Sequence, residues 1–274
     1  MGNYKMVCSD IDGTLLNSDY QFSKENLLAI EKLVQQGGWF VPSTGRTFSE
    51  VPDEIKLHPG IRYYIYSNGA AVLDRQTGKC HQTCISNGVS RQILDILYGC
   101  ESHITVRHNG ECYVDAAYAN EDAFDYYNVC QAHRVVVNAF SVFRDDFREF
   151  SYQADEVEVI SVFFRRYEDL LESKRQIEAL DGLRVVGVSE YNLEIMNANA
   201  GKGNALRWLA EQLEIDWHQT IAVGDTDNDQ SMIEAAGLGL AVANACDGLK
   251  AAADAVICSN DEHAIDYILS HYFA

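Results

Sequence analysis

The string Asp10-Ile11-Asp12-Gly13-Thr14-Leu15 places two carboxylates two residues apart, directly after the apolar run Met6-Val7-Cys8. Two carboxylates that converge on one small volume can serve as a nucleophile and a neighbouring acid/base. Gly13 lets the chain turn sharply behind them, and the Thr14 hydroxyl can hydrogen-bond the loop. Backbone amides of such a loop can receive an anion. A simple Asx-turn at a strand end is the competing interpretation, but the complete string favours chemistry.

Three further segments carry reactive side chains. Ser43-Thr44-Gly45-Arg46 offers a hydroxyl, a backbone amide and a cation, which suit a phosphoryl group. Lys202 stands between two glycines at the start of an expected helix, where a solvated loop is the alternative. Gly224-Asp225-Thr226-Asp227-Asn228-Asp229 holds three acids in five residues, which repel one another unless a cation neutralises them. Hard oxygen ligands of this kind suit Mg²⁺, although Asp229 can also serve as a helix cap.

These motifs need elements that bring them together. Each of the strand-end motifs follows a short apolar run, and helical patterns separate the runs, as in the segment that starts near Ser23 as N-cap and stops at Gly37-Gly38. Alternating strands and helices predict a parallel sheet covered on both faces. Ligands bind such sheets outside the carboxyl ends of the strands. The expected strands cover residues 6–8, 39–41, 63–66, 220–223 and 240–242.

The middle third has a different pattern. Residues 104–106 and 112–114 flank Asn109-Gly110, a strong hairpin signal, and residues 157–164 form another expected strand before a helical pattern over 168–180. The predicted fold class is therefore α/β. A Rossmann-like doubly wound parallel sheet forms the core over residues 1–81 and 190–274, and an α+β domain is inserted over residues 82–189.

The composition is strongly acidic. Forty-one Asp and Glu face 21 Lys and Arg, which gives a net charge of −20. Such a surface argues against nucleic acid, whose binding needs clustered basic residues, and against an anionic membrane. Residues 190–274 hold 14 acidic and three basic residues. Most of these acids suit a solvated surface, and a few of them can hold a cation.

Eight cysteines are present, without any Cys-x-x-Cys pair. The N-terminus has no signal-peptide pattern, and no apolar run approaches the ~20 residues of a membrane span. We therefore expect buried free thiols in a cytoplasmic protein.

The four motifs occur in order, each at an expected strand end or helix start. In this arrangement the chain resembles the haloacid-dehalogenase-like hydrolases. Within them it is similar to the Cof-type phosphatase branch, whose type IIB cap is inserted between the second and third motifs. The resemblance covers essentially the whole chain, and it includes Asn68-Gly69-Ala70 and residues 244–254.

The resemblance implies a set of roles. Asp10 would attack phosphorus and become an aspartyl phosphate, and Asp12 would protonate the leaving oxygen and then activate water. Thr44, the Gly45 amide and Lys202 would bind the transferring phosphoryl group. The implied cofactor is Mg²⁺, held by Asp10, the Asp12 backbone carbonyl and Asp225, with Asp229 acting through water. The implied phosphate- and substrate-binding set consists of Ile11, Thr44, Gly45, Arg46, Asn68, Lys202 and Asn228.

The expected substrate is a small phosphate ester, such as a sugar phosphate or a phosphorylated cofactor, because a large cap that closes over the site excludes a phosphoprotein. His108, Asn109 and Glu111, around the hairpin turn, are candidates for substrate contact. We expect a monomer or a weak homo-oligomer. Two alternatives stay open: a phosphomutase of the phosphomannomutase type, and an aspartate-phosphorylated receiver-like switch that is not an enzyme.

Overall fold

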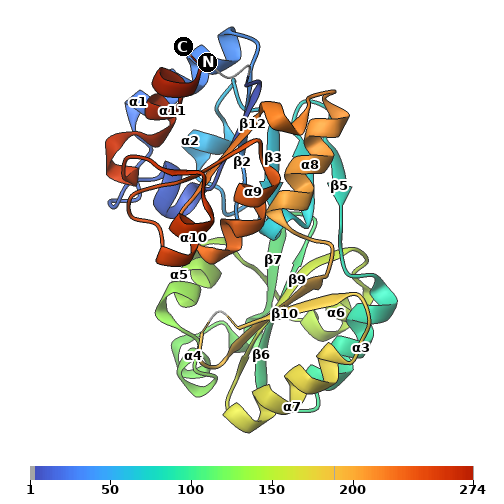
Figure 1. Cartoon of the computed structure of the whole chain (residues 1–274). Coiled ribbons are helices and arrows are strands. Elements are labelled where there is room, and N and C mark those ends of the chain that lie inside the picture. Colours follow the sequence, from blue (N-terminus) through green and yellow to red (C-terminus); the bar gives the residue numbers. More distant parts are fainter. Residues whose placement is uncertain (1–3, 188, 274) are drawn as a thin grey trace. The chain divides into compact units, whose positions relative to one another are not determined.

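The structure is a computed structural model that describes residues 4–187 and 189–273. It divides into two compact units. The first unit comprises Met1–Arg46, Val51–His81 and Gly201–Ala274, and the second comprises Thr47–Glu50 and Gln82–Ala200. Figure 1 shows that the first unit contains both the blue start and the red end of the chain. Distant parts of the sequence are therefore joined in one sheet.

That sheet has five parallel strands in the order β14-β13-β12-β1-β2. All residues of the central strands β1 and β12 are buried, which explains their continuous apolar sequences. The predicted parallel core is confirmed. Its strands are β1 (Met6–Ser9), β2 (Trp39–Pro42), β12 (Thr220–Gly224), β13 (Leu238–Ala241) and β14 (Ala255–Val256).

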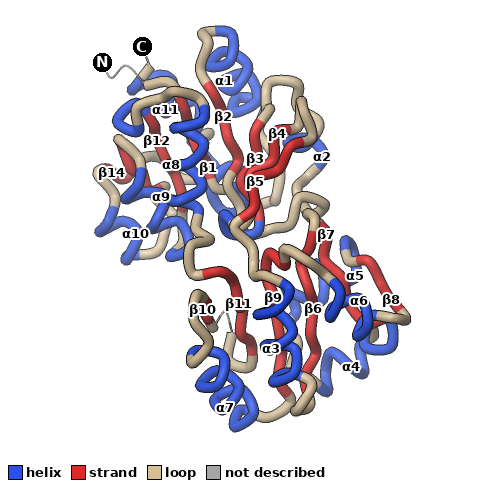
Figure 2. The backbone as a smooth tube through the Cα atoms, turned by 90° about the vertical axis from the view of Figure 1, so that its right-hand side faces the viewer, coloured by secondary structure: helices blue, strands red, loops and turns tan. Residues whose placement is uncertain are grey.

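Helices cover this sheet. Ser23 caps α1 as predicted, because its side chain accepts a hydrogen bond from the Asn26 N–H at 3.2 Å. Helix α1 packs against α11 and β2, whereas α9 packs against β12 and β13 (Figure 2). The helices of this unit are α1 (Lys24–Gln35), α2 (Asp53–Lys56), α8 (Lys202–Gln212), α9 (Gln230–Ala235), α10 (Asp247–Ala252) and α11 (Ala264–Tyr272).

One expected strand of the parallel sheet lies elsewhere. Strand β3 (Tyr63–Tyr66) pairs antiparallel with β4 (Ala71–Asp74), and together with β5 (Lys79–Gln82) they form a separate three-stranded sheet. The turn over Ser67–Gly69 reverses the chain directly after β3, so the strand pairs with its own neighbour. A single bridge between Ser43 and Ile65 links β3 to the end of β2.

The second unit contains a six-stranded sheet in the order β10-β11-β9-β6-β7-β8. The predicted hairpin is confirmed: Asn109 and Gly110 join β6 to β7 with φ of 52° and 76°, as a two-residue type I′ turn requires. This unit extends to Ala200, whereas the sequence predicted that the inserted domain ends at residue 189, because β11 pairs antiparallel with β9 and β10 inside this unit. The strands are β6 (Ser102–His108), β7 (Glu111–Asp115), β8 (Val142–Arg144), β9 (Val157–Phe164), β10 (Leu183–Val186) and β11 (Asn192–Asn197).

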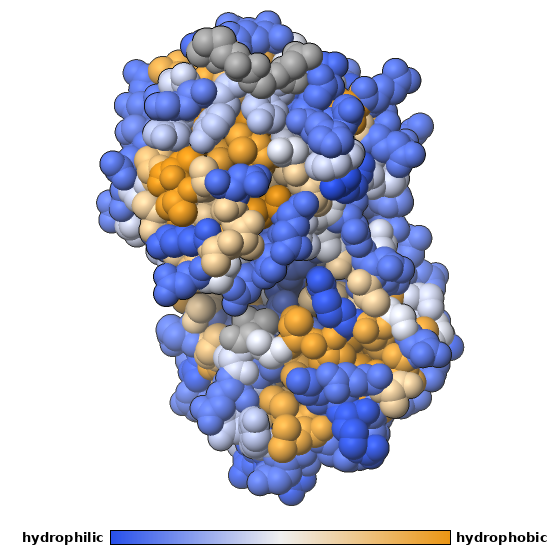
Figure 3. Space-filling view, viewed as in Figure 1, coloured by the Kyte–Doolittle hydropathy of each residue, from blue (hydrophilic) through white to orange (hydrophobic). Residues whose placement is uncertain are grey.

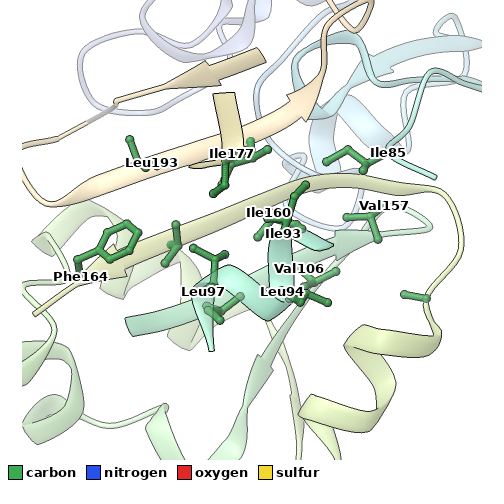
Figure 4. Close-up of a cluster of buried hydrophobic side chains, with 14 of the residues drawn as sticks. Ile85, Ile93, Leu94, Leu97, Val106, Val157, Ile160, Phe164, Ile177 and Leu193 are labelled. Carbon is green, nitrogen blue, oxygen red and sulfur yellow. The ribbon is translucent and has the colours of Figure 1, made fainter. Parts of the chain in front are cut away.

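The two faces of this sheet differ. One face carries a large hydrophobic core, in which Ile93, Leu94 and Leu97 of α3 meet Ile160 and Phe164 of β9 (Figure 4). Alternate residues of β6, namely His103, Thr105 and Arg107, are also buried but polar. The helices are α3 (Asn87–Leu97), α4 (Glu121–Tyr126), α5 (Gln131–Phe140), α6 (Phe147–Gln153) and α7 (Tyr167–Glu178).

The face shown in Figure 3 is mostly hydrophilic, with hydrophobic patches between the polar side chains. All eight cysteines are free thiols. The expectation that they are buried is right for Cys8 and Cys112 and wrong for Cys80 and Cys130, which are exposed. Among the described residues, none of the helices has the length and hydrophobicity needed to cross a bilayer.

Candidate active site

The loop after β1 brings the first motif to the carboxyl edge of the parallel sheet. The Asp10 N–H donates to the Val223 carbonyl at 3.0 Å, so the backbone of β1 stays aligned with β12 up to this residue. Gly13 has φ of +73°, and a Cβ atom there would lie 2.3 Å from Asp225 Oδ2. Only glycine fits both the turn and the close approach to the Asp225 carboxylate. The side chain of Asp10 is buried.

Lys202 is the first residue of α8, and its ammonium group is fully buried. Its Nζ donates to Asp10 Oδ1 and to Asp229 Oδ1, each at 2.6 Å. Gly69 lies so close to the start of α8 that a Cβ atom would stand 2.3 Å from the Gly201 carbonyl oxygen. This packing fixes where the helix begins. The lysine is thereby placed between two carboxylates that are 219 positions apart in sequence, with Asp10 at one end and Asp229 at the other.

The acidic loop after β12 folds around Asp229. Its Oδ2 atom accepts hydrogen bonds from the N–H groups of Asp225 (3.0 Å) and Thr226 (3.2 Å), so Asp229 is a cap, as predicted, and also a partner of Lys202. The Thr14 hydroxyl donates to Asp225 Oδ1 at 3.3 Å. One carboxylate oxygen from each of Asp10, Asp225 and Asp229 lies within 4.8 Å of the others.

The charges in this cluster do not balance, since three carboxylates face one ammonium group. Burial, together with the charges of Asp229 and Asp225, raises the pKa of Asp10 well above its usual value, although Lys202 opposes the shift. Burial and then Asp229 raise the pKa of Asp225 to about 6. Burial alone would lower the pKa of Lys202, but its two carboxylate partners outweigh it and raise the pKa. A divalent cation with oxygen ligands fits this excess of negative charge.

The remaining predicted site residues border the cluster. Thr44 is buried, and its hydroxyl oxygen accepts a hydrogen bond from the Arg46 N–H at 3.1 Å. Asn228 donates to Asn68 Oδ1 at 3.3 Å, and a Cβ atom on Gly45 would lie 2.9 Å from that same oxygen. The segments that carry Thr44-Gly45, Asn68 and Asn228 are thus adjacent. The Ile11 side chain is buried, so only its backbone can serve an anion.

The Arg46 guanidinium group forms an ion pair with the Asp12 carboxylate. Its Nε donates to Asp12 Oδ2 at 2.8 Å, and its Nη2 donates to Asp12 Oδ1 at 2.7 Å. The sequence indicated a substrate-binding role for this arginine and gave no signal that it pairs with the second acid of the first motif.

The comparisons with known proteins agree with this geometry. The family model for haloacid dehalogenase-like hydrolases matches residues 7–269. The chain belongs to this family. It is 34% identical to the phosphatase YwpJ of Bacillus subtilis, over 97% of this chain and 99% of that protein. It is 27% identical to the 5-amino-6-(5-phospho-D-ribitylamino)uracil phosphatase YwtE of the same organism, over 97% of this chain and 96% of that protein.

A solved structure of a haloacid dehalogenase-like hydrolase from B. subtilis superposes with a TM-score of 0.79 at 32% identity, covering 98% of this chain and 99% of that one. The chain is therefore a phosphatase of the Cof-type branch, and the fold class predicted from the sequence is confirmed. Neither the mutase nor the receiver alternative receives support from these relatives.

In this phosphatase one residue of the site region, Asn244, has a role that the sequence did not predict. The Asn244 side chain donates to the Gly13 carbonyl at 2.8 Å and so fastens the turn behind the two aspartates. Its other side-chain atom, Oδ1, accepts from the Asn260 N–H at 2.9 Å. The sequence offered two signals for Asn244, its position just beyond the expected strand 240–242 and its place in the stretch 244–254 that shares the family resemblance, and neither specifies a partner 231 residues away.

Proposed function

We propose that the protein is a Mg²⁺-dependent phosphatase of small phosphorylated metabolites that forms an aspartyl phosphate on Asp10. The observation that carries this proposal is the buried Lys202 ammonium, which lies 2.6 Å from both Asp10 Oδ1 and Asp229 Oδ1. This contact orients Asp10 and leaves its Oδ2 as the oxygen for attack. It also places a fixed cation beside the point where a phosphoryl group would bond, which is where charge stabilisation is most effective.

The reaction would use the two aspartates of the first motif in turn. Asp10 Oδ2 forms a bond to phosphorus, the bond from phosphorus to the leaving oxygen breaks, and Asp12 gives that oxygen a proton. A water then attacks phosphorus and loses its proton to Asp12, while the bond from phosphorus to Asp10 breaks. Thr44, the Gly45 amide and Lys202 would bind the phosphoryl oxygens.

The residues that would hold Mg²⁺ are Asp10, the Asp12 backbone carbonyl and Asp225, with Asp229 acting through water. Bound there, the ion would offset the repulsion between a carboxylate and a phosphate. The excess of carboxylates over ammonium groups in this cluster supports the assignment.

The proposed substrates are sugar phosphates or phosphorylated cofactors. A relative named for a phosphatase of 5-amino-6-(5-phospho-D-ribitylamino)uracil matches almost the full length of this chain, which supports a small phosphorylated metabolite. The second unit would act as the cap, with His108, Asn109 and Glu111 as candidates for substrate contact.

The test is release of inorganic phosphate from a panel of metabolite esters, with Mg²⁺ and with a chelator. We expect turnover with Mg²⁺, loss of turnover with the chelator, and loss in Asp10→Asn by at least about 10³-fold, because the nucleophile is removed. Thermal melting shows whether the variant is folded. A folded Asp10→Asn protein that retains wild-type turnover contradicts the assignment.

A matched pair of variants tests the metal ligands. Asp225→Asn should abolish the rise in melting temperature that Mg²⁺ causes, because Asp225 lies within the carboxylate cluster. Asp227→Asn, in the same loop but exposed, should leave that rise unchanged. Equal responses from the two variants would contradict the proposed ligand set.

A further inference from the structure

Arg46 and Asp12 form a bidentate ion pair at the edge of the site. Both carboxylate oxygens are engaged, at 2.8 Å and 2.7 Å, by Nε and Nη2 of the same guanidinium group. Such side-on pairing fixes the plane of the carboxylate as well as its position. The two residues belong to loops that follow neighbouring strands, since β1 and β2 pair from Met6 and Trp39 to Ser9 and Pro42.

The two aspartates of the first motif therefore have separate cations. Asp10 is buried and bonds to Lys202, whereas Asp12 is 41% exposed and bonds to Arg46. A guanidinium group has donors and no acceptor, so each Asp12 oxygen that faces it acts as an acceptor. The pair thus fixes the orientation of the Asp12 side chain, which is the group that would take the proton from water in the proposed reaction.

We propose that Arg46 is a positioning residue for Asp12, and that its main effect is on the hydrolysis of the phosphoenzyme. This inference rests on the function proposed above. In that step the oxygen of water bonds to phosphorus, Asp12 takes the proton, and the bond from phosphorus to Asp10 breaks. Without Arg46 the exposed Asp12 side chain has several rotamers available, and the water loses its aligned base.

A role as a direct phosphate ligand makes the opposite prediction. A phosphate ligand assists substrate binding and the first chemical step, so its loss raises KM and slows formation of the phosphoenzyme. Loss of a residue that positions the base slows only the second step when the leaving group needs no proton. The phosphoenzyme then accumulates, and KM falls together with kcat.

The experiment uses p-nitrophenyl phosphate with Mg²⁺, because nitrophenolate leaves without general acid help. In Arg46→Met we expect a burst of nitrophenolate of about one equivalent per enzyme, a kcat lowered by at least about 10²-fold, and a lowered KM. Arg46→Lys keeps the charge without the bidentate geometry and should show the same burst with a smaller loss of kcat.

The matched control is Arg62→Met. Arg62 makes a bidentate pair with Asp74 in the same unit, at 2.9 Å and 2.7 Å, so its loss reproduces the loss of an ion pair. This variant should keep the wild-type kcat and KM. Melting curves of all three variants identify any that do not fold. If Arg46→Met does not fold, the burst, kcat and KM of Arg46→Lys provide the test.

Two results would overturn the inference while leaving the proposed function intact. One is a lost burst with a raised KM, which identifies a phosphate ligand, and the other is a folded Arg46 variant with wild-type kcat. An inactive wild-type enzyme on the whole ester panel would instead remove the proposed function, and the inference with it.

Discussion

The two units bury ionisable groups in different arrangements. In the first unit Asp10, Lys202 and Asp229 are buried side by side as direct ion pairs of 2.6 Å. In the second unit Arg107, Glu194 and His103 lie on one face of the six-stranded sheet, where Arg107 and Glu194 are 3.3 Å apart and burial lowers the pKa of His103 to about 4. The first unit thus gathers several carboxylates around one buried ammonium group, where phosphoryl transfer would need charge, whereas the second unit pairs Arg107 with Glu194 and keeps His103 neutral near pH 7.

The largest effect is expected when the buried ammonium group of Lys202 is removed from the first unit. Lys202→Met should lower turnover by at least about 10³-fold, because it removes the fixed positive charge beside the phosphoryl group. It should also lower the free energy of unfolding by about 3–5 kcal/mol, since Asp10 and Asp229 lose their buried partner. Phosphate release and denaturant unfolding measure the two effects.

The control for this variant is Lys24→Met, an exposed lysine at the start of α1. It should leave turnover at the wild-type level and change the free energy of unfolding by no more than about 0.5 kcal/mol. If Lys202→Met unfolds at the same denaturant concentration as the control, the pairs at 2.6 Å do not stabilise the first unit.

A second test acts on the hydrophobic core of the other unit. Phe164 is fully buried between β9 and the helices, and Phe164→Ala should lower stability by about 3–5 kcal/mol. The site residues belong to the first unit, so the rise in melting temperature caused by Mg²⁺ should persist. Limited proteolysis should cut first within residues 82–200. Phe143→Ala, at a side chain 48% exposed, is the control with a small effect. Cleavage that begins in the first unit would contradict the prediction that Phe164→Ala destabilises mainly the second unit.

The sequence predicted those features that depend on neighbours along the chain. The Ser23 cap, the turn at Asn109-Gly110 and the strand before Asp10 all follow from local residue types. The parallel order of the core could be predicted because alternating strands and helices allow few other arrangements.

The features that depend on distant partners could not be predicted in this way. Strand β3 has the same apolar character as the core strands, and only the reversal at Ser67–Gly69 sends it into a separate sheet. Strand β11 joins the second unit through its antiparallel partners β9 and β10. The contact between Arg46 and Asp12 joins two loops 34 residues apart, and neither local sequence specifies it.

The smallest test concerns pH. His103 is 1% exposed and packs edge-on against Phe124, and burial lowers its pKa from 6.5 to about 4. The folded protein therefore binds a proton less readily than the unfolded chain, so stability is lost as the pH falls below about 6.5, until both forms are protonated near pH 4. At pH 5 the loss of stability from this residue should be about 2 kcal/mol relative to pH 8.

His103→Phe should remove this part of the pH dependence, whereas His271→Phe on the exposed surface of α11 should keep it. Denaturant unfolding at pH 8 and pH 5 measures this pH dependence. If the free energy of unfolding falls equally between pH 8 and pH 5 in the wild type and in His103→Phe, the second unit does not hold this histidine neutral.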